Sequence, residues 1–140
     1  MAKNVWIGNS RWPSGRNLGE FAKDVFRIEN CKTDKEKALA FYEWLIRIMM
    51  RGPNFTVPDG FGTYSRSFDT MGMFASFGCF ECTGWGWVGA EALQSAGLKA
   101  RRVVGQNDGH TIYEVFYDDN WHAFDAFQAW YFLNDSKEVA

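Results

Sequence analysis

The chain of 140 residues has the length of one ordinary domain, with 46% hydrophobic and 23% charged residues. This composition excludes a disordered or fibrous protein, and the net charge of -2 excludes a general attraction to phosphate backbones or anionic lipids. We therefore expect a single soluble domain over residues 1–140 that binds neither nucleic acid nor a membrane.

Two further compositional features bear on function. No apolar run approaches the roughly 20 residues of a membrane span, and the first residues lack the apolar core of a signal peptide. The sequence therefore does not indicate in which cellular compartment the protein is located. Three cysteines are too few for a disulfide framework. The aromatic content of 18% exceeds what a core of this size needs, so some aromatic side chains are expected to line a cleft.

The first part of the chain predicts helices. Residues 1–17 contain glycine and proline and form an irregular lead-in, and residues 18–52 are predicted as helical. The first helix covers residues 18–28. The second begins at Thr33 and Glu36, which have capping-box spacing, and continues with apolar residues at helical intervals.

The middle of the chain combines a long loop with another helix. Residues 53–81 are rich in glycine and aromatic residues without a sustained period, and so long a loop in a small domain is usually functional. Residues 82–97 then predict a helix that ends at Gly97, with Cys82 on the same inward face as Trp85. Its internal glycines are costly unless another backbone or a substrate approaches closely.

Residues 98–127 change to a period of two. The segments LKARRVVG, HTIYEVFY and NWHAFDAF are rich in β-branched and aromatic residues, and Asp118-Asp119 separates the last two. They predict an antiparallel β-meander. Helices followed by such a meander are typical of an α+β fold.

The stretch CFECTGWGWVG, residues 79–89, allows three readings. Gly84, Gly86 and Gly89 match a dinucleotide-binding G-x-G-x-x-G, but a hairpin follows where further βαβ units are needed. Cys79 and Cys82 match a redox C-x-x-C, although no βαβ pattern precedes them. A zinc site would need four ligands, which this chain does not offer in the usual spacing.

The third reading is that Cys82 is a catalytic nucleophile, against the alternative that it is a small buried residue. A two-residue turn at Asp118-Asp119 pairs residues whose numbers sum to 237, which places Asp125 diagonally next to His110. A carboxylate and an imidazole so placed are the partners that a catalytic thiol requires. His122 points the opposite way and is expected to be a solvated surface histidine.

Two spaced motifs resemble the transglutaminase-like superfamily of papain-related cysteine enzymes. The run AEALQSAGLKARRVVG after Cys82 is similar to the family's segment that follows its nucleophile, and HTIYEVFYDDNWHAFD is similar to its His-to-Asp segment. The likeness covers about residues 20–130. It implies a fold in which the cysteine-bearing helix packs on an antiparallel sheet together with N-terminal helices.

The resemblance also implies a function. Cys82 would be the nucleophile, His110 the general base and then acid, and Asp125 the group that orients the imidazole. The oxyanion would be held by the Cys82 backbone N–H and an upstream side chain, for which Tyr64 is a candidate. The expected enzyme is a peptidase or amidase, or a transglutaminase, that acts on a peptide or protein amide and needs no cofactor or metal.

Two other functions stay open at this point. The same fold could serve as a non-catalytic module that binds a peptide or protein through the aromatic loop, since large exposed aromatic side chains serve binding as readily as catalysis. A C-x-x-C thiol-disulfide oxidoreductase is the lesser alternative. The oligomeric state is not predicted.

Overall fold

The computed structural model describes residues 10–48, 50–51, 56–58, 64–66, 79–106, 109–134 and 139, with the backbone alone for the four short strands before residue 81. In chain order the elements are α1 (Leu18–Ile28), α2 (Asp34–Ile48), β1 (Met50–Arg51), β2 (Thr56–Pro58), β3 (Tyr64–Arg66), β4 (Cys79–Phe80), α4 (Cys82–Ser95), β5 (Ala100–Val104), β6 (Thr111–Tyr117), β7 (Asn120–Asp125) and β8 (Trp130–Tyr131).

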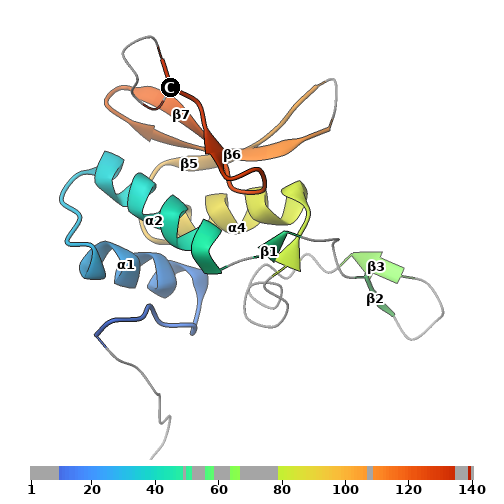
Figure 1. Cartoon of the computed structure of the whole chain (residues 1–140), viewed down its shortest axis with the longest axis horizontal. Coiled ribbons are helices and arrows are strands. Elements are labelled where there is room, and N and C mark those ends of the chain that lie inside the picture. Colours follow the sequence, from blue (N-terminus) through green and yellow to red (C-terminus); the bar gives the residue numbers. More distant parts are fainter. Residues whose placement is uncertain are drawn as a thin grey trace, which may run out of the picture.

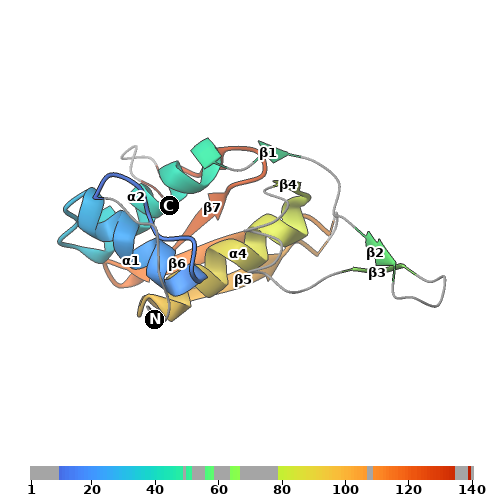
Figure 2. The same ribbon diagram turned by 90° about the horizontal axis from the view of Figure 1, so that it is seen from below.

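Helices α1, α2 and α4 lie on one face of an antiparallel sheet, which confirms the predicted α+β fold (Figure 1). The sheet has the order β5-β6-β7-β8. Helix α4 lies directly against β5 and β6, and α1 packs on both α4 and α2. Seen from below, α4 lies alongside β5 and β6, so it is the helix whose position relative to these strands decides the site (Figure 2).

The first two helices begin as the sequence predicts. The side chain of Asn17 accepts a hydrogen bond from the Glu20 N–H at 2.8 Å, which caps α1. At α2, the Thr33 hydroxyl accepts from the Glu36 N–H, and the Glu36 carboxylate accepts from the Thr33 N–H. This reciprocal pair is the predicted capping box.

The predicted helical region 18–52 is too long at its C-terminal end. Helix α2 stops at Ile48, and residues 50–51 form β1, which pairs in parallel with β4. Within the predicted loop 53–81, β2 and β3 pair as an antiparallel ribbon apart from the main sheet (Figure 1). The rest of that loop lies outside the described residues. Two- and three-residue strands carry too few side chains for a period of two to be recognised.

The predicted meander is confirmed, and its register is the predicted one. Tyr117 pairs with Asn120 across a turn in which Asp118 and Asp119 have φ of 47° and 60°. Positive φ at both central residues is the type I′ geometry that matches strand twist. Strand β8 extends the sheet beyond the predicted 98–127 and pairs with β7.

The core lies between the helices and the sheet. Trp85 of α4, Phe41 and Tyr42 of α2, and Tyr113 and Phe124 of the sheet are almost completely buried. The rings of Tyr113 and Phe124 stack with centroids 5.6 Å apart. Within the described ranges, no helix combines the length and apolar character that a membrane span requires.

Candidate active site

Cys82 is the first residue of α4. Strand β4 leads into it, and Glu81 at the N-cap is extended, with φ of -76° and ψ of 174°. The first bond of the helix runs from the Trp85 N–H to the Glu81 carbonyl at 3.2 Å, so the Cys82 N–H lies ahead of the hydrogen-bonded turns. Cys82 is a half-buried free thiol at the positive end of a helix.

Two glycines set the distance between α4 and the sheet. A Cβ at Gly86 would collide with the Thr111 methyl group, and a Cβ at Gly89 would collide with the ring of Tyr113. At Gly86 the backbone carbonyl of Ile112 also lies 3.1 Å from the position of that Cβ, so the predicted close approach of another backbone is confirmed there. At Gly89 the approaching group is a side chain of β6 instead. Because His110 immediately precedes β6, this contact also brings the start of that strand close to α4.

His110 and Asp125 are joined by a short hydrogen bond. His110 Nε2 lies 2.6 Å from Asp125 Oδ2, and an ionised carboxylate only accepts, so Nε2 donates. The other carboxylate oxygen, Oδ1, accepts from the Gln128 N–H at 2.9 Å. Asp125 is 3% exposed. Held at both oxygens and buried, this carboxylate fixes both the tautomer and the orientation of the imidazole.

Cys82, His110 and Asp125 all line one pocket of about 490 Å³. They come from the start of α4, from the residue before β6 and from the end of β7. The other described residues that line it are Gly109, Gln128, Trp130 and Phe132. The arrangement therefore presents a thiol and an oriented imidazole to a cavity of the size that small ligands occupy.

Sequence reasoning missed two aromatic residues that line this pocket. Trp130 and Phe132 are 62% and 48% exposed, although both are large and apolar. The aromatic run Trp130-Tyr131-Phe132 just beyond the predicted meander was the available signal. It was not recognised because β8 has only two residues and shows no alternation.

His122 corrects a prediction. It does point away from Asp125's side of the strand, but it is buried rather than solvated. Its Nε2 lies 3.0 Å from the Tyr117 carbonyl, its Nδ1 contacts the Val139 carbonyl, and its ring stacks on Tyr117. The face that His122 occupies is the one covered by the helices. The residue is structural and lies outside the candidate pocket.

The competing readings of residues 79–89 fare differently. Gly84, Gly86 and Gly89 lie inside α4 and are buried, so they form no loop around a pyrophosphate, and the dinucleotide reading is wrong. The side chains of Cys79 and Tyr64 lie outside the described residues. The redox reading and the Tyr64 oxyanion assignment therefore stay predictions.

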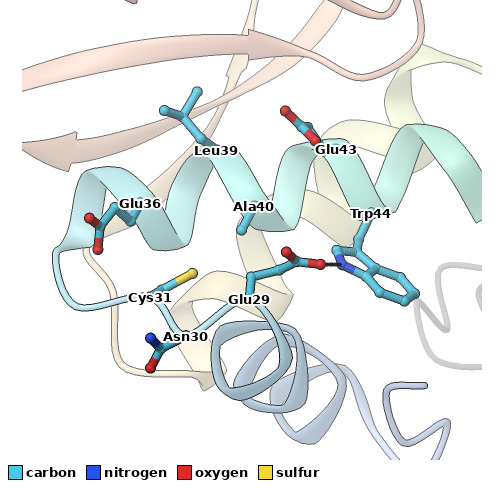
Figure 3. A pocket seen from close by; sticks show the side chains of 8 residues that line it. All are labelled: Glu29, Asn30, Cys31, Glu36, Leu39, Ala40, Glu43 and Trp44. Atoms are coloured by element: carbon cyan, nitrogen blue, oxygen red, sulfur yellow. Dashed lines mark hydrogen bonds between the residues drawn. The ribbon is translucent and has the colours of Figure 1, made fainter. Parts of the chain in front are cut away.

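A second pocket, of about 350 Å³, lies between the end of α1 and α2. Figure 3 shows the Glu29 carboxylate reaching the Trp44 indole, whose Nε1 donates to it at 2.7 Å. Cys31 lies beside it, and burial together with the Glu36 and Glu29 carboxylates raises the pKa of its thiol. The Glu36 carboxylate accepts from the Lys32 and Thr33 N–H groups. The Glu29–Trp44 bond therefore joins the end of α1 to α2, and the Glu36 bonds hold the segment between the two helices.

No protein-family model and no curated protein matches the chain. A solved structure described as the crystal structure of a TGase is similar to it, with a TM-score of 0.54 and 20% sequence identity. The match covers 78% of this chain and 30% of that chain, so this chain spans less than a third of that protein's length. At this identity the likeness establishes the fold alone, which is transglutaminase-like.

Proposed function

We propose that this protein is a cysteine-dependent acyl-transfer enzyme that acts on amide bonds through a thioester on Cys82. The observation that carries the proposal is the single pocket that holds Cys82, His110 and Asp125, with the imidazole bound to the carboxylate at 2.6 Å. A thiol, a base and an orienting acid are the parts that nucleophilic acyl transfer requires. The transglutaminase-like fold agrees with this assignment.

The first half-reaction forms the acyl-enzyme. Because Nε2 of His110 is bonded to Asp125, Nδ1 is the nitrogen that takes the thiol proton. Cys82 Sγ then attacks the amide carbonyl carbon, and the C–N bond breaks as His110 returns the proton to the departing amine. The negative charge on Sγ, and later on the carbonyl oxygen, lies at the N-terminal end of α4, where the helix dipole and the Cys82 N–H stabilise it.

The second half-reaction releases the acyl group. Water gives up a proton to His110 and attacks the thioester, and the product acid leaves as the proton returns to Cys82. A primary amine in place of water gives transamidation with the same three residues. We propose hydrolysis, and therefore a peptidase or amidase, as the first assignment.

The test starts from thiol reactivity, which needs no known substrate. Iodoacetamide is added at neutral pH to the full chain and its variants, and peptide mapping follows alkylation at each cysteine. His110→Ala is expected to slow alkylation of Cys82 specifically. With a substrate in hand, the same substitution and Asp125→Asn are each expected to lower the acylation rate by about 10²–10⁴-fold.

The acyl chemistry is tested with a mixture of peptides from a protein digest. An acid quench followed by mass spectrometry identifies acyl groups held on Cys82, and a fluorescent primary amine distinguishes transfer to amines from hydrolysis. Cys31→Ser is the matched control, because Cys31 is the other described free thiol and lies in the second pocket. If His110→Ala leaves Cys82 alkylation unchanged and no acyl-enzyme forms, the enzyme assignment fails and a non-catalytic binding module takes its place.

A further inference from the structure

We infer that Trp130 and Phe132 form a binding site for a large apolar side chain, aromatic or branched aliphatic, on the acyl half of the substrate. This inference rests on the proposed function and names the substrate class for it. The two rings belong to the same pocket as Cys82 and His110. The acyl half is the part that stays bound through both half-reactions, so a site for its side chain orients the carbonyl twice.

The sheet holds Trp130 next to the catalytic carboxylate. Across β7 and β8, Trp130 pairs directly with Asp125. The connecting turn contains Gln128, whose N–H holds Asp125 Oδ1 at 2.9 Å, and Ala129, whose φ of 57° is unusual for a residue other than glycine. The indole is therefore carried by an element that is itself bonded to the site. A group on a paired strand is positioned more precisely than one on a loop.

Trp130 and Phe132 differ from the exposed tryptophans Trp12 and Trp87 in what their rings contact. Trp12 packs edge-on against Trp44 at 5.5 Å, and the guanidinium of Arg102 lies 4.2 Å above the ring of Trp87. In the part of the chain that the structure describes, Trp130 and Phe132 have no such aromatic or cationic partner. An apolar group that covers them removes exposed aromatic surface from water, which is favourable.

The chemistry of the lining argues against a charged side chain. Apart from His110 and Asp125, which are paired with each other, the described residues that line the pocket with Cys82 are Gly109, Gln128, Trp130 and Phe132. A Lys or Glu side chain on the substrate would lose hydration against these rings, and among the described lining residues only the His110–Asp125 pair carries an ionisable group besides Cys82. The volume of about 490 Å³ lies within the range of small-ligand sites, so it accommodates one large side chain together with the amide.

The experiment compares acyl-side probes on the intact chain. Blocked amino-acid chloromethyl ketones carrying Phe, Leu, Gly, Lys or Glu side chains alkylate a catalytic thiol by displacing chloride and forming a thioether. The Phe and Leu probes are expected to alkylate Cys82 about 10-fold faster than the Gly, Lys and Glu probes, after correction for each probe's rate with a free thiol. Iodoacetamide, which has no such side chain, reports on the thiol and imidazole alone.

Variants assign the preference to the two rings. Trp130→Ala and Phe132→Ala are each expected to reduce the Phe-over-Gly ratio by about 3- to 10-fold. Because both probes are compared on the same variant, any change in the general reactivity of Cys82 cancels from this ratio, and the iodoacetamide rate of each variant measures that change separately. Leu133→Ala is the matched control, since Leu133 is 53% exposed in the same segment but lies outside the pocket lining. Trp130→Phe keeps an aromatic ring and is expected to retain most of the ratio.

Failures of the two proposals are distinguishable. If iodoacetamide alkylation of Cys82 depends on His110 but the Phe-over-Gly ratio is absent or unchanged in both alanine variants, the inference is overturned and the proposed function stands. If iodoacetamide alkylation of Cys82 is independent of His110, both the proposed function and this inference are overturned. A preference for the Lys or Glu probe would also overturn the apolar assignment.

Discussion

At the scale of single residues, Cys31 and Cys82 are thiols in opposite surroundings. Cys31 follows α1 and faces the acidic second pocket, where burial and the carboxylates of Glu36 and Glu29 raise its pKa. Cys82 begins a helix and shares its pocket with an imidazole. Since the thiolate is the nucleophile, the electrostatics of each site should decide how fast each cysteine reacts.

The first prediction concerns Cys31. At neutral pH its thiolate fraction is small, so iodoacetamide should modify Cys31 more slowly than Cys82. Glu36→Gln removes one of the negative charges that raise the pKa and should therefore speed alkylation of Cys31 alone. Peptide mapping over time measures both rates, and Glu20→Gln on α1 is the control. An unchanged Cys31 rate in Glu36→Gln would contradict this electrostatic account.

The second prediction concerns Tyr113. Its hydroxyl is completely buried, and among the described residues it has no hydrogen-bond partner. Leaving a buried polar group unsatisfied is costly, so Tyr113→Phe should raise the free energy of unfolding by about 1 kcal/mol. Urea denaturation measures this change. Tyr131→Phe, at an exposed tyrosine, should have little effect.

The pH dependence of Tyr113 adds a second readout. Burial, and then the neighbouring Tyr42, raise the pKa of Tyr113 well above its ordinary value. The hydroxyl therefore contributes no pH dependence below about pH 10, where the unfolded chain also keeps it protonated. Above that pH the unfolded state loses the proton and the folded state keeps it, so stability falls by about 1.4 kcal/mol per pH unit. Tyr113→Phe should lack this component.

At the scale of elements, the helix ends are where local sequence acts most directly. Thr33 and Glu36 exchange side-chain to backbone hydrogen bonds at the start of α2. At the end of α4, Gly97 has φ of 98°, its N–H bonds the Gln94 carbonyl, and the Leu98 N–H bonds the Leu93 carbonyl. These two bonds form a Schellman motif, in which the residue after the C-cap adopts a positive φ, a conformation that glycine adopts without strain. Both ends were predictable because each depends on residues only a few positions apart.

The third prediction tests the α2 cap. Thr33→Ala should lower the free energy of unfolding by about 1 kcal/mol, whereas Thr33→Ser should retain most of the stability.

The Glu36 side of the same cap should show a pH dependence. Hydrogen bonds from the Lys32 and Thr33 N–H groups lower the pKa of Glu36. The carboxylate therefore stabilises the fold above its ordinary pKa, and this contribution is lost as pH falls through the lowered value. The stability difference between the wild type and Glu36→Gln should accordingly narrow in acid, and a constant difference would contradict the capping role.

At the scale of the whole molecule, periodicity and turn chemistry predicted most of the architecture. Helical spacing predicted α1, the start of α2 and α4, and the Asp118-Asp119 turn predicted the register that brings His110 to Asp125. The predictions that were wrong concern features that depend on contacts between segments distant in the sequence. Residues 50–51 become a strand only because 79–80 lie beside them, and His122 is buried against Val139. No local pattern in the sequence contains either contact.

The last prediction tests whether the α4–β6 contact holds both the fold and the site. At Gly89, alanine would favour an isolated helix by about 1 kcal/mol, but its Cβ would press on the buried Tyr113 ring, and overpacking of this kind costs about 1–3 kcal/mol. The tightly packed ring cannot move aside cheaply, so we expect Gly89→Ala to lower stability. Because Cys82 and His110 lie on opposite sides of this contact, the variant should also weaken the His110 dependence of Cys82 alkylation. Gly15→Ala, which meets open space, is the control, and a Gly89→Ala protein more stable than the wild type would show that helix propensity outweighs the contact.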